Sequence, residues 1–441
     1  MNNTLAVFQE ISSLISLNSL YNKSIEIYDT IISLDQTIFT QLENQLSKLT
    51  IEDNEIFLSE NDYLSSLLLF LLEHIPTEIN LNLLTSTETE YHQITSSTMK
   101  IYKPDIIPKN QNIVRYSSES QRILNHLFKY FQVKNLEEFL LLKQNTQPIY
   151  LHCLHHLTPL LLKTTYNQYP IAIELFVHII TSINQSSLSD IFDIIFPVCL
   201  ITLDDPTMDM KLISLYLIDY LQKNCTTTEL LLFNRANVIM YGLEQNLHRR
   251  GDKIIFFECL LATTFRWLII LENEIYAGKH LFIRTSQFIE RFIRDSLLEI
   301  NIEYRRSLLK ILQHYINRLE LFALRHLNHF LELIDDSVDN RLLRYDSLQI
   351  LLIIIQTLKP RINIHRLNIM KIIIRCLFKI FHEDKQNISI INLLKKLLKE
   401  FQLSTMNNYV QDAFQSLIQT SELDLSYREY LQKFLDTIED I

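Results

Sequence analysis

Glycine is nearly absent from this chain, and that absence limits the available folds more than any other feature. It occurs at Gly242, Gly251 and Gly278 in 441 residues, where average usage of about 7% would give roughly thirty. Phosphate-binding loops, dinucleotide fingerprints and tight hairpin turns need glycine, because a residue without a Cβ adopts positive φ at little cost and lets backbone amides approach a phosphate. The sequence lacks these motifs and favours helices joined by short polar connections.

The apolar pattern predicts an all-α protein built from helical repeats. Hydrophobic residues make up 47% of the chain and there are only nine prolines, which argues against disorder. We expect an N-terminal helical region at 1–83, a Ser- and Thr-rich polar loop or linker at 84–120, and an α-solenoid of HEAT- or armadillo-like repeats at 121–441. Polar breaks between helices are expected near residues 145, 168, 184, 204, 225, 251, 336, 361, 384 and 404. Each helix pair of a solenoid buries its apolar face only against its neighbours, so chain length does not limit folding.

Cysteine usage indicates a protein of the cytoplasm and nucleus, and the net charge bears on its partners. The five cysteines are odd in number and never form a CxxC pair, which predicts buried, reduced thiols. The first residues lack the basic flank of a signal peptide. The apolar run at 254–271 contains Glu258 and Arg266, which predicts a buried helix rather than a membrane span. A formal net charge of -10 disfavours direct nucleic-acid binding.

Two acidic clusters lie between apolar helical segments. We expect each in a turn, where carboxylates that cap a helix start contribute about 0.5 to 2 kcal/mol and hold neighbouring repeats in register. Helical spacing after the first cluster places Lys211 and Asp219 on the outer face of the next helix. The predicted structural residues are Asp204, Asp205, Pro206 and Lys211 in the first cluster, and Asp335 and Asp336 in the second.

The same clusters leave a metal site open as an alternative. Asp335, Asp336 and Asp339 spell DDxxD, and in all-helical isoprenoid synthases such motifs hold magnesium bound to diphosphate. Hard Mg²⁺ prefers carboxylate oxygens and substrate phosphates. Because both clusters are expected in turns rather than inside a helix that faces a cavity, the capping interpretation is favoured. We expect no catalytic residue, no metal and no cofactor, with an isoprenoid-synthase-like enzyme as the first alternative.

A basic segment without acidic residues runs from 347 to 382. Within it, cations recur every four residues and therefore share one helix face. The stripe is either a solvated outer face or a docking surface for an acidic partner segment, where Arg361 can form paired hydrogen bonds to a carboxylate. The predicted partner-binding residues are Pro360, Arg361, Arg366, Lys371, Arg375 and Lys379.

Two stretches of the sequence are similar to a known family. The first is "FPVCLITLDDPTMDMKLISLYLIDYLQKN" followed by "FNRANVIMYGLEQNLH", an apolar helix that enters a Leu-Asp-Asp loop with a Lys shortly afterwards. The second is "SLQILLIIIQTLKPRINIHRLNIMKIIIRCLFKI", in which Pro360, Arg361 and Ile362 match a helix-ending turn and Lys359 replaces an aromatic residue. Both resemble the family of the second Tel-two-interacting protein, the smallest subunit of the TTT co-chaperone complex.

The resemblance implies a HEAT-repeat scaffold without catalytic activity. Its expected partners are the two larger helical-repeat subunits of that complex. Through them it is expected to support the maturation of phosphatidylinositol-3-kinase-related kinases with the ninety-kilodalton heat-shock chaperone, and so telomere and DNA-damage signalling. A HEAT-like adaptor associated with transport or nucleic acid is the second alternative.

Overall fold

The chain divides into two compact units, unit 1 (Met1–Trp267) and unit 2 (Leu268–Ile441). The predicted boundaries at 83 and 120 stay predictions, because most of the segment between them lies outside the described residues. The computed structural model describes residues 37–46, 63–73, 75, 79–80, 101–102, 117–144, 146–183, 188–247, 253–272, 282–383, 388–405, 409–420 and 423–439.

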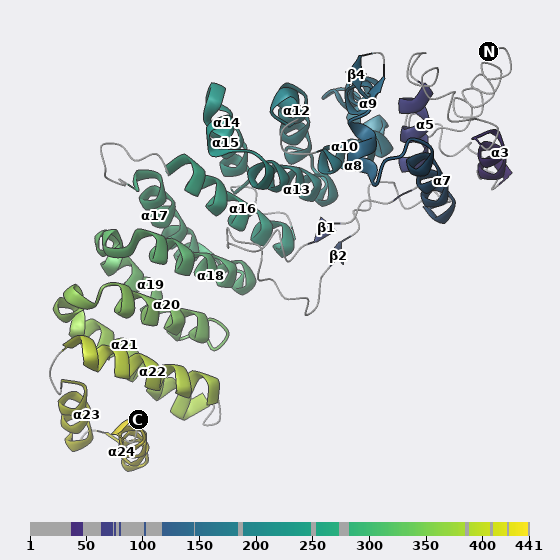
Figure 1. Cartoon of the computed structure of the whole chain (residues 1–441). Coiled ribbons are helices and arrows are strands. Elements are labelled where there is room, and N and C mark those ends of the chain that lie inside the picture. The colour runs from purple at the N-terminus through teal and green to yellow at the C-terminus, as the bar shows by residue number, and fades with distance from the viewer. Residues whose placement is uncertain are drawn as a thin grey trace. The chain divides into compact units, whose positions relative to one another are not determined.

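The described part of unit 1 consists of helices and two short antiparallel strand pairs, β1 with β2 and β3 with β4 (Figure 1). Its elements are α3 (Thr37–Leu46), α5 (Tyr63–Leu72), β1 (Ile79–Asn80), β2 (Ile101–Tyr102), α7 (Ser117–Tyr130), α8 (Leu136–Leu140), β3 (Lys143–Gln144), β4 (Gln147–Pro148), α9 (Ile149–Leu157), η3 (Thr158–Leu161), η4 (Tyr166–Gln168), α10 (Pro170–Ser182), η5 (Ser189–Ile191), α12 (Phe192–Leu203), α13 (Met208–Asn224), α14 (Thr227–Leu231), η6 (Leu232–Asn234), α15 (Arg235–Leu247) and most of α16 (Ile254–Glu272), within which the unit boundary falls.

The described part of unit 2 is helical throughout. After the end of α16, its elements are α17 (Ile283–Leu298), α18 (Ile302–Leu319), η7 (Glu320–His326), α19 (Leu327–Val338), α20 (Arg344–Thr357), η8 (Lys359–His365), α21 (Arg366–Glu383), α22 (Ile388–Thr405), α23 (Tyr409–Gln419) and α24 (Leu425–Glu439).

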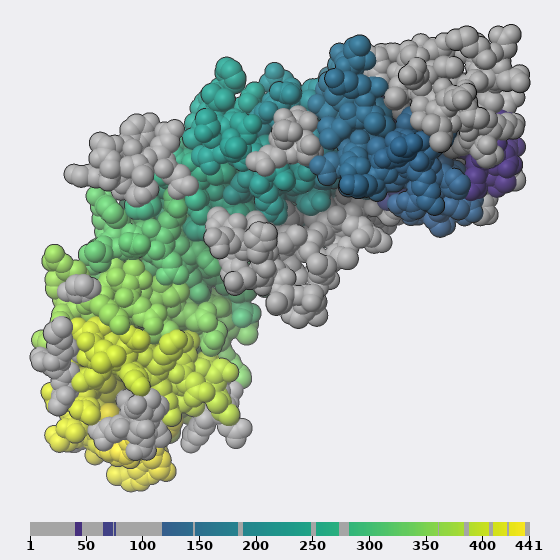
Figure 2. Space-filling model, viewed as in Figure 1, coloured from purple at the N-terminus to yellow at the C-terminus, as the bar shows by residue number. Residues whose placement is uncertain are grey.

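The helices of unit 2 alternate between two layers. In one layer α17 packs against α19 and α19 against α21, and in the other α18 packs against α20 and α20 against α22. Contacts of α17 with α18 and of α19 with α20 join the layers. Figure 2 shows the colours of this unit following one another as contiguous bands from green to yellow. Such packing of each helix pair on its sequence neighbours is the arrangement of HEAT-like repeats.

Unit 1 repeats this alternation. Helix α12 packs against α13, while α10 contacts α13 and α12 contacts α15. Gly242 in α15 permits the last of these approaches, since an added Cβ would lie 3.1 Å from Leu200 Cδ2, closer than the roughly 3.5–4.0 Å of ordinary carbon contact. The predicted all-α fold of HEAT-like helical repeats is therefore confirmed.

The cores of both units are mainly apolar, as the composition predicts. All five cysteines are buried and free, and burial raises the pKa of the Cys225 and Cys259 thiols to about 12. These thiols stay neutral at physiological pH and are therefore poor nucleophiles.

Helix α16 is the only helix in the described ranges that is long and apolar enough to cross a membrane. Most of its length is buried inside the protein, with Arg266 and Trp267 fully buried. Its apolar composition is explained by that burial, as predicted for 254–271.

One stretch departs from the predicted segmentation. No break is predicted between 251 and 336, yet α17 ends at Leu298 and α18 begins at Ile302. The Asn301 side chain starts α18 by accepting a hydrogen bond from the Glu303 backbone N–H at 2.9 Å. Neither glycine nor proline marks this turn, so the capping Asn is the signal that would identify it.

Candidate partner-binding surface

The first acidic cluster forms a hydrogen-bonded turn between α12 and α13, in which Asp205 is buried while Asp204 and Pro206 are exposed. Asp205 is only 3% exposed, and its Oδ1 accepts hydrogen bonds from the backbone N–H and the hydroxyl of Thr207, each at 2.6 Å. Its Oδ2 accepts a hydrogen bond from the Tyr166 hydroxyl at 2.6 Å. Asp204 is the C-cap residue of α12. Asp205 therefore ties the turn to η4, which precedes α10.

The environment of this turn keeps Tyr166 protonated. Burial, reinforced by the hydrogen bond to Asp205, raises the pKa of Tyr166 to about 12.

Pro206 is exposed in the same turn, where its missing amide hydrogen costs little. The contacts assign Asp205 a structural function inside unit 1, while its predicted part in repeat register stays a prediction.

The prediction that Lys211 and Asp219 face outward from α13 is wrong. Their exposed fractions are 3% and 2%, and the Lys211 ammonium lies 5.1 Å from the centre of the Phe256 ring in α16. Helix α13 also packs against α12 and α10. A helix with neighbours on several sides has no single solvated face, so the one-stripe model of an amphipathic helix does not apply to it.

Asp219 is the centre of a buried ion-pair network between α13 and α16. Its Oδ1 lies 3.0 Å from Arg266 Nη2, and its Oδ2 pairs with Lys223 one helical turn along. Arg266 also donates a hydrogen bond to the Thr263 hydroxyl at 3.1 Å. The Arg266 side chain is fully buried, whereas Lys223 retains 26% exposure. This network joins two unit 1 helices, with Lys223 at its partly exposed end.

The second acidic cluster lies at the end of a helix and not in a turn, contrary to the prediction. Asp335 and Asp336 belong to the last turn of α19, and Asp339 is its C-cap residue. Carboxylates are unfavourable at the negative end of a helix dipole, so they need nearby cations. Asp336 pairs with Arg305 of α18, which also donates to the Ser337 hydroxyl at 2.8 Å.

The basic stripe of α21 supplies the cations for the other two carboxylates. Arg375 bridges them, with its Nη1 3.0 Å from Asp335 Oδ1 and its Nη2 paired with Asp339. Lys371 lies 3.4 Å from Asp335, and Lys379 lies 3.9 Å from Asp339. These contacts form an ion-pair ladder between α19 and α21. Partner binding by these three cations stays a prediction, and it would compete with the ladder.

The other predicted partner-binding residues lie at one edge of unit 2. Because α18 packs on α20 and α19 packs on α21, the connections η7 (α18 to α19) and η8 (α20 to α21) emerge at the same ends of neighbouring helix pairs. Pro360 is in the first turn of η8, and nothing further is described of its side chain. We call this surface the turn edge and define it by Leu321, Phe322, Arg325, Arg361, Ile364, Arg366 and Leu367.

The turn edge combines exposed apolar side chains with cations. Ile364 and Leu367 are 78% and 72% exposed, and Leu321 and Phe322 are 55% and 41% exposed. Large apolar side chains that are exposed together on one edge are typical of interaction surfaces. The sequence indicates Arg361 and Arg366 but neither Arg325 nor this apolar component, which an isolated helical pattern assigns to the core.

The arginines of the turn edge differ in how they are held. Arg325 lies over the Phe322 ring at 5.9 Å, and Arg366 lies over the Tyr409 ring at 4.8 Å. Arg361 is exposed and has no ion pair among the described residues. Arginines stacked on aromatic rings keep donors available for a carboxylate.

These features define a helical-repeat protein with an exposed apolar and cationic edge. The chain is distantly related to TELO2-interacting protein 2, in agreement with the predicted resemblance. The rat protein of that name is 23% identical over 277 residues, covering 60% of this chain and 52% of the rat protein. The human protein is 22% identical over 230 residues, covering 50% of this chain and 44% of the human protein.

The chain thus spans about half the length of the curated relatives it matches. No family model matches the chain. Among solved structures, a crystal structure of importin beta matches with a TM-score of 0.37 and 10% identity, covering 95% of this chain and 50% of importin beta.

Proposed function

We propose that this chain is a non-catalytic scaffold subunit that binds a larger helical-repeat subunit through the turn edge of unit 2. The observation that carries the proposal is the exposure of four large apolar side chains beside three arginines at the turn edge. Full burial of an exposed Leu, Ile or Phe side chain contributes about 1.5–3 kcal/mol. These four side chains are 41–78% exposed, so each contributes a corresponding fraction of that free energy, and together they offset part of the cost of association.

The relation to TELO2-interacting protein 2 supports a more specific version of this proposal. By analogy with that protein's name, we propose a TELO2-like protein as one partner within a TTT-type co-chaperone complex. In that setting the chain acts in the cytoplasm and nucleus to support maturation of phosphatidylinositol-3-kinase-related kinases with the ninety-kilodalton heat-shock chaperone. Its own contribution is shape: a solenoid segment buries surface against another solenoid without refolding.

Affinity purification of the tagged full chain from its own cells, followed by mass spectrometry, tests the proposal. We expect two larger helical-repeat subunits, one of them related to TELO2. The double variant Ile364→Asp/Leu367→Asp should lose at least nine-tenths of both, because charge replaces exposed apolar contacts at the centre of the proposed interface.

A matched control variant lies at the opposite edge of unit 2. Ile300 and Leu342, in the connections from α17 to α18 and from α19 to α20, are 94% and 60% exposed. Ile300→Asp/Leu342→Asp therefore makes the same chemical change at comparable exposure and should retain both partners. Recovery of neither partner by the wild-type chain would contradict the proposal. Recovery of transport cargo or RNA instead would favour the adaptor alternative.

A further inference from the structure

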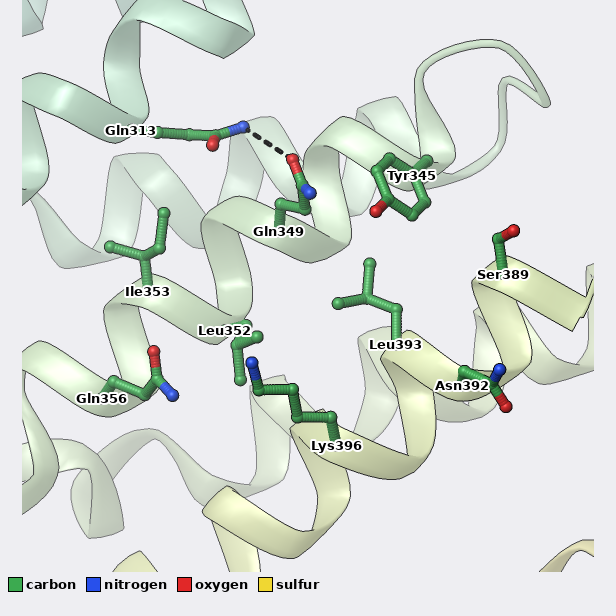
Figure 3. Close-up of a pocket in the computed structure, with 10 residues that line it drawn as sticks. All are labelled: Gln313, Tyr345, Gln349, Leu352, Ile353, Gln356, Ser389, Asn392, Leu393 and Lys396. Atoms are coloured by element: carbon green, nitrogen blue, oxygen red, sulfur yellow. Dashed lines mark hydrogen bonds between the residues drawn. The ribbon is translucent and has the colours of Figure 1, made fainter. Parts of the chain in front are cut away.

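A groove lies between α20 and α22 in unit 2, and none of the residues that define the turn edge lines it. It has a volume of about 520 Å³ and is open to solvent (Figure 3). Its lining residues are Gln313 from α18, Tyr345, Gln349, Leu352, Ile353 and Gln356 from α20, and Ser389, Asn392, Leu393 and Lys396 from α22.

Carboxamides dominate the polar part of the lining. Gln313, Gln349, Gln356 and Asn392 each carry both a donor and an acceptor. A peptide backbone also presents donors and acceptors, so carboxamides can pair with it whatever its side chains are. The hydrogen bonds that three of these glutamine side chains make within the protein are long. Gln313 Nε2 lies 3.4 Å from Gln349 Oε1, and Gln356 Nε2 lies 3.5 Å from Glu400 Oε1, near the upper limit for hydrogen bonds.

The length of the groove matches a short extended chain. Tyr345, Gln349, Ile353 and Gln356 recur at three- and four-residue intervals and follow one face of α20. At about 1.5 Å of rise per residue, that face extends roughly 16 Å. An extended peptide advances about 3.3 Å per residue, so about five residues fill the groove.

Charge and apolar contacts restrict which peptide fits. The lining contains one cation, Lys396, and no carboxylate. In Figure 3 the Lys396 side chain extends from α22 toward Leu352 on α20. The aliphatic residues of the lining are Leu352, Ile353 and Leu393, which we call the apolar floor. Since alternate side chains of an extended chain face the same side, an apolar residue can contact this floor while an acidic residue reaches Lys396.

We propose that this groove binds an extended segment of about five residues from another protein chain, with an apolar residue on the Leu352 floor and a carboxylate at Lys396. The segment belongs to a partner subunit if the scaffold function proposed above holds. The amides of Gln349 and Gln356 pair with its backbone.

Panning a phage-displayed library of random twelve-residue peptides on the full chain tests the inference. We expect the enriched sequences to share an acidic residue and an apolar residue at alternating spacing. One enriched peptide, labelled with a fluorophore, then reports affinity by anisotropy. Lys396→Glu should weaken binding at least tenfold, and Gln349→Met/Gln356→Met should do the same, because Met keeps the side-chain size and removes the amide.

Matched controls lie outside the groove. Lys310→Glu repeats the charge change at an exposed lysine of α18, and Gln287→Met repeats the amide change at an exposed position of α17; both should bind within twofold of the wild type. N-methylation of single backbone nitrogens in the peptide should lower affinity at alternate positions, as expected for an extended chain whose backbone pairs with the side-chain amides of the groove. A period of three to four residues would show a bound helix and overturn the proposal.

Other outcomes also decide the matter. Failure to enrich peptides, or equal binding by all variants, would overturn the inference. A concentration-dependent dimer that dissociates on Lys396→Glu would assign the groove to a second copy instead. Partner subunits that co-purify with the wild type, in the absence of any peptide binding, would leave the scaffold function standing and remove only the groove proposal. Peptide binding without recovery of the partner subunits would leave the groove proposal standing and remove the scaffold function.

Discussion

The buried network around Asp219 makes a quantitative prediction for the substitution Asp219→Leu. Arg266 is fully buried and its Nη2 lies 3.0 Å from Asp219, so removing the carboxylate leaves a guanidinium without its countercharge in the core. Breaking a buried pair in this way costs about 3–5 kcal/mol. Lys223 retains 26% exposure and can turn to solvent, so it adds little. The expected loss is a large fraction of the about 5–15 kcal/mol by which a domain is stable.

The double variant Asp219→Leu/Arg266→Met distinguishes the cost of leaving a buried charge without its partner from the cost of lost packing. It removes both charges and fills their volume with apolar groups, which is often neutral or stabilising relative to the pair. We expect its stability to lie within about 1–2 kcal/mol of the wild type. The single variant Arg266→Met should cost less than Asp219→Leu, because Lys223 still pairs with Asp219.

Urea unfolding followed by far-ultraviolet circular dichroism measures these differences, and hydrogen exchange of α13 and α16 amides locates them. Asp193→Leu is the matched control, since that carboxylate is 98% exposed and the change should stay within about 0.5 kcal/mol. Two results would refute the reasoning: a loss below about 1 kcal/mol for Asp219→Leu, or a double variant as unstable as the sum of the single ones.

Three further predictions concern the remaining polar contacts. Asp205→Ala should lower the free energy of unfolding by about 2–4 kcal/mol in urea titration, because it removes the acceptors of buried donors, and Asp205→Asn should lower it less. The pKa of Tyr166 is about 12 when folded, against 10.0 for the ordinary side chain, so this group's stabilisation is complete below pH 10 and is lost as pH rises toward 12. Tyr166→Phe should reduce the fall in the free energy of unfolding over that interval by about 2–3 kcal/mol, which urea titrations at several pH values measure. Arg375→Met should cost about 0.5–1.5 kcal/mol at low salt and less in 1 M NaCl, because the Asp335 and Asp339 pairs are partly exposed and screened; an equal loss at both salt concentrations would exclude an electrostatic cause.

The fold class follows from the sequence because it depends on a composition that leaves few alternatives. Scarce glycine and long apolar periodicity exclude most folds with tight turns, and the buried cysteines and the buried α16 follow from the same pattern. Lys211 and Asp219 are placed wrongly because periodicity assumes one solvated face. Contacts of α13 with α10, α12 and α16 remove that face, and no local pattern encodes how many neighbours a helix has.

The candidate sites show the same limit. Arg361 and Arg366 lie on an exposed edge that the sequence indicates through its cations, while the apolar Ile364 and Leu367 beside them resemble core residues in sequence. The groove cannot be predicted from the sequence, because its side-chain amides come from three helices and form no sequence motif. The spacing of Tyr345, Gln349, Ile353 and Gln356 along α20 is a signal that could have indicated a polar face.

Charge counted along one segment is a poor guide to free charge in a helical-repeat protein. The basic stripe of α21 has no acid in its own segment, yet Lys371 meets Asp335 from 36 residues earlier and Arg375 meets it from 40 residues earlier. One repeat length brings the next helix of the same layer alongside, so charges separated by one repeat neutralise each other across helix faces. Cations in a connection can also be neutralised, since Lys359 of η8 pairs with Glu400 at 2.8 Å. Arg361 of η8 is exposed and has no ion pair among the described residues. Arg361 should therefore contribute more to partner affinity than Lys371, a ranking that Arg361→Gln and Lys371→Gln can test in the same purification.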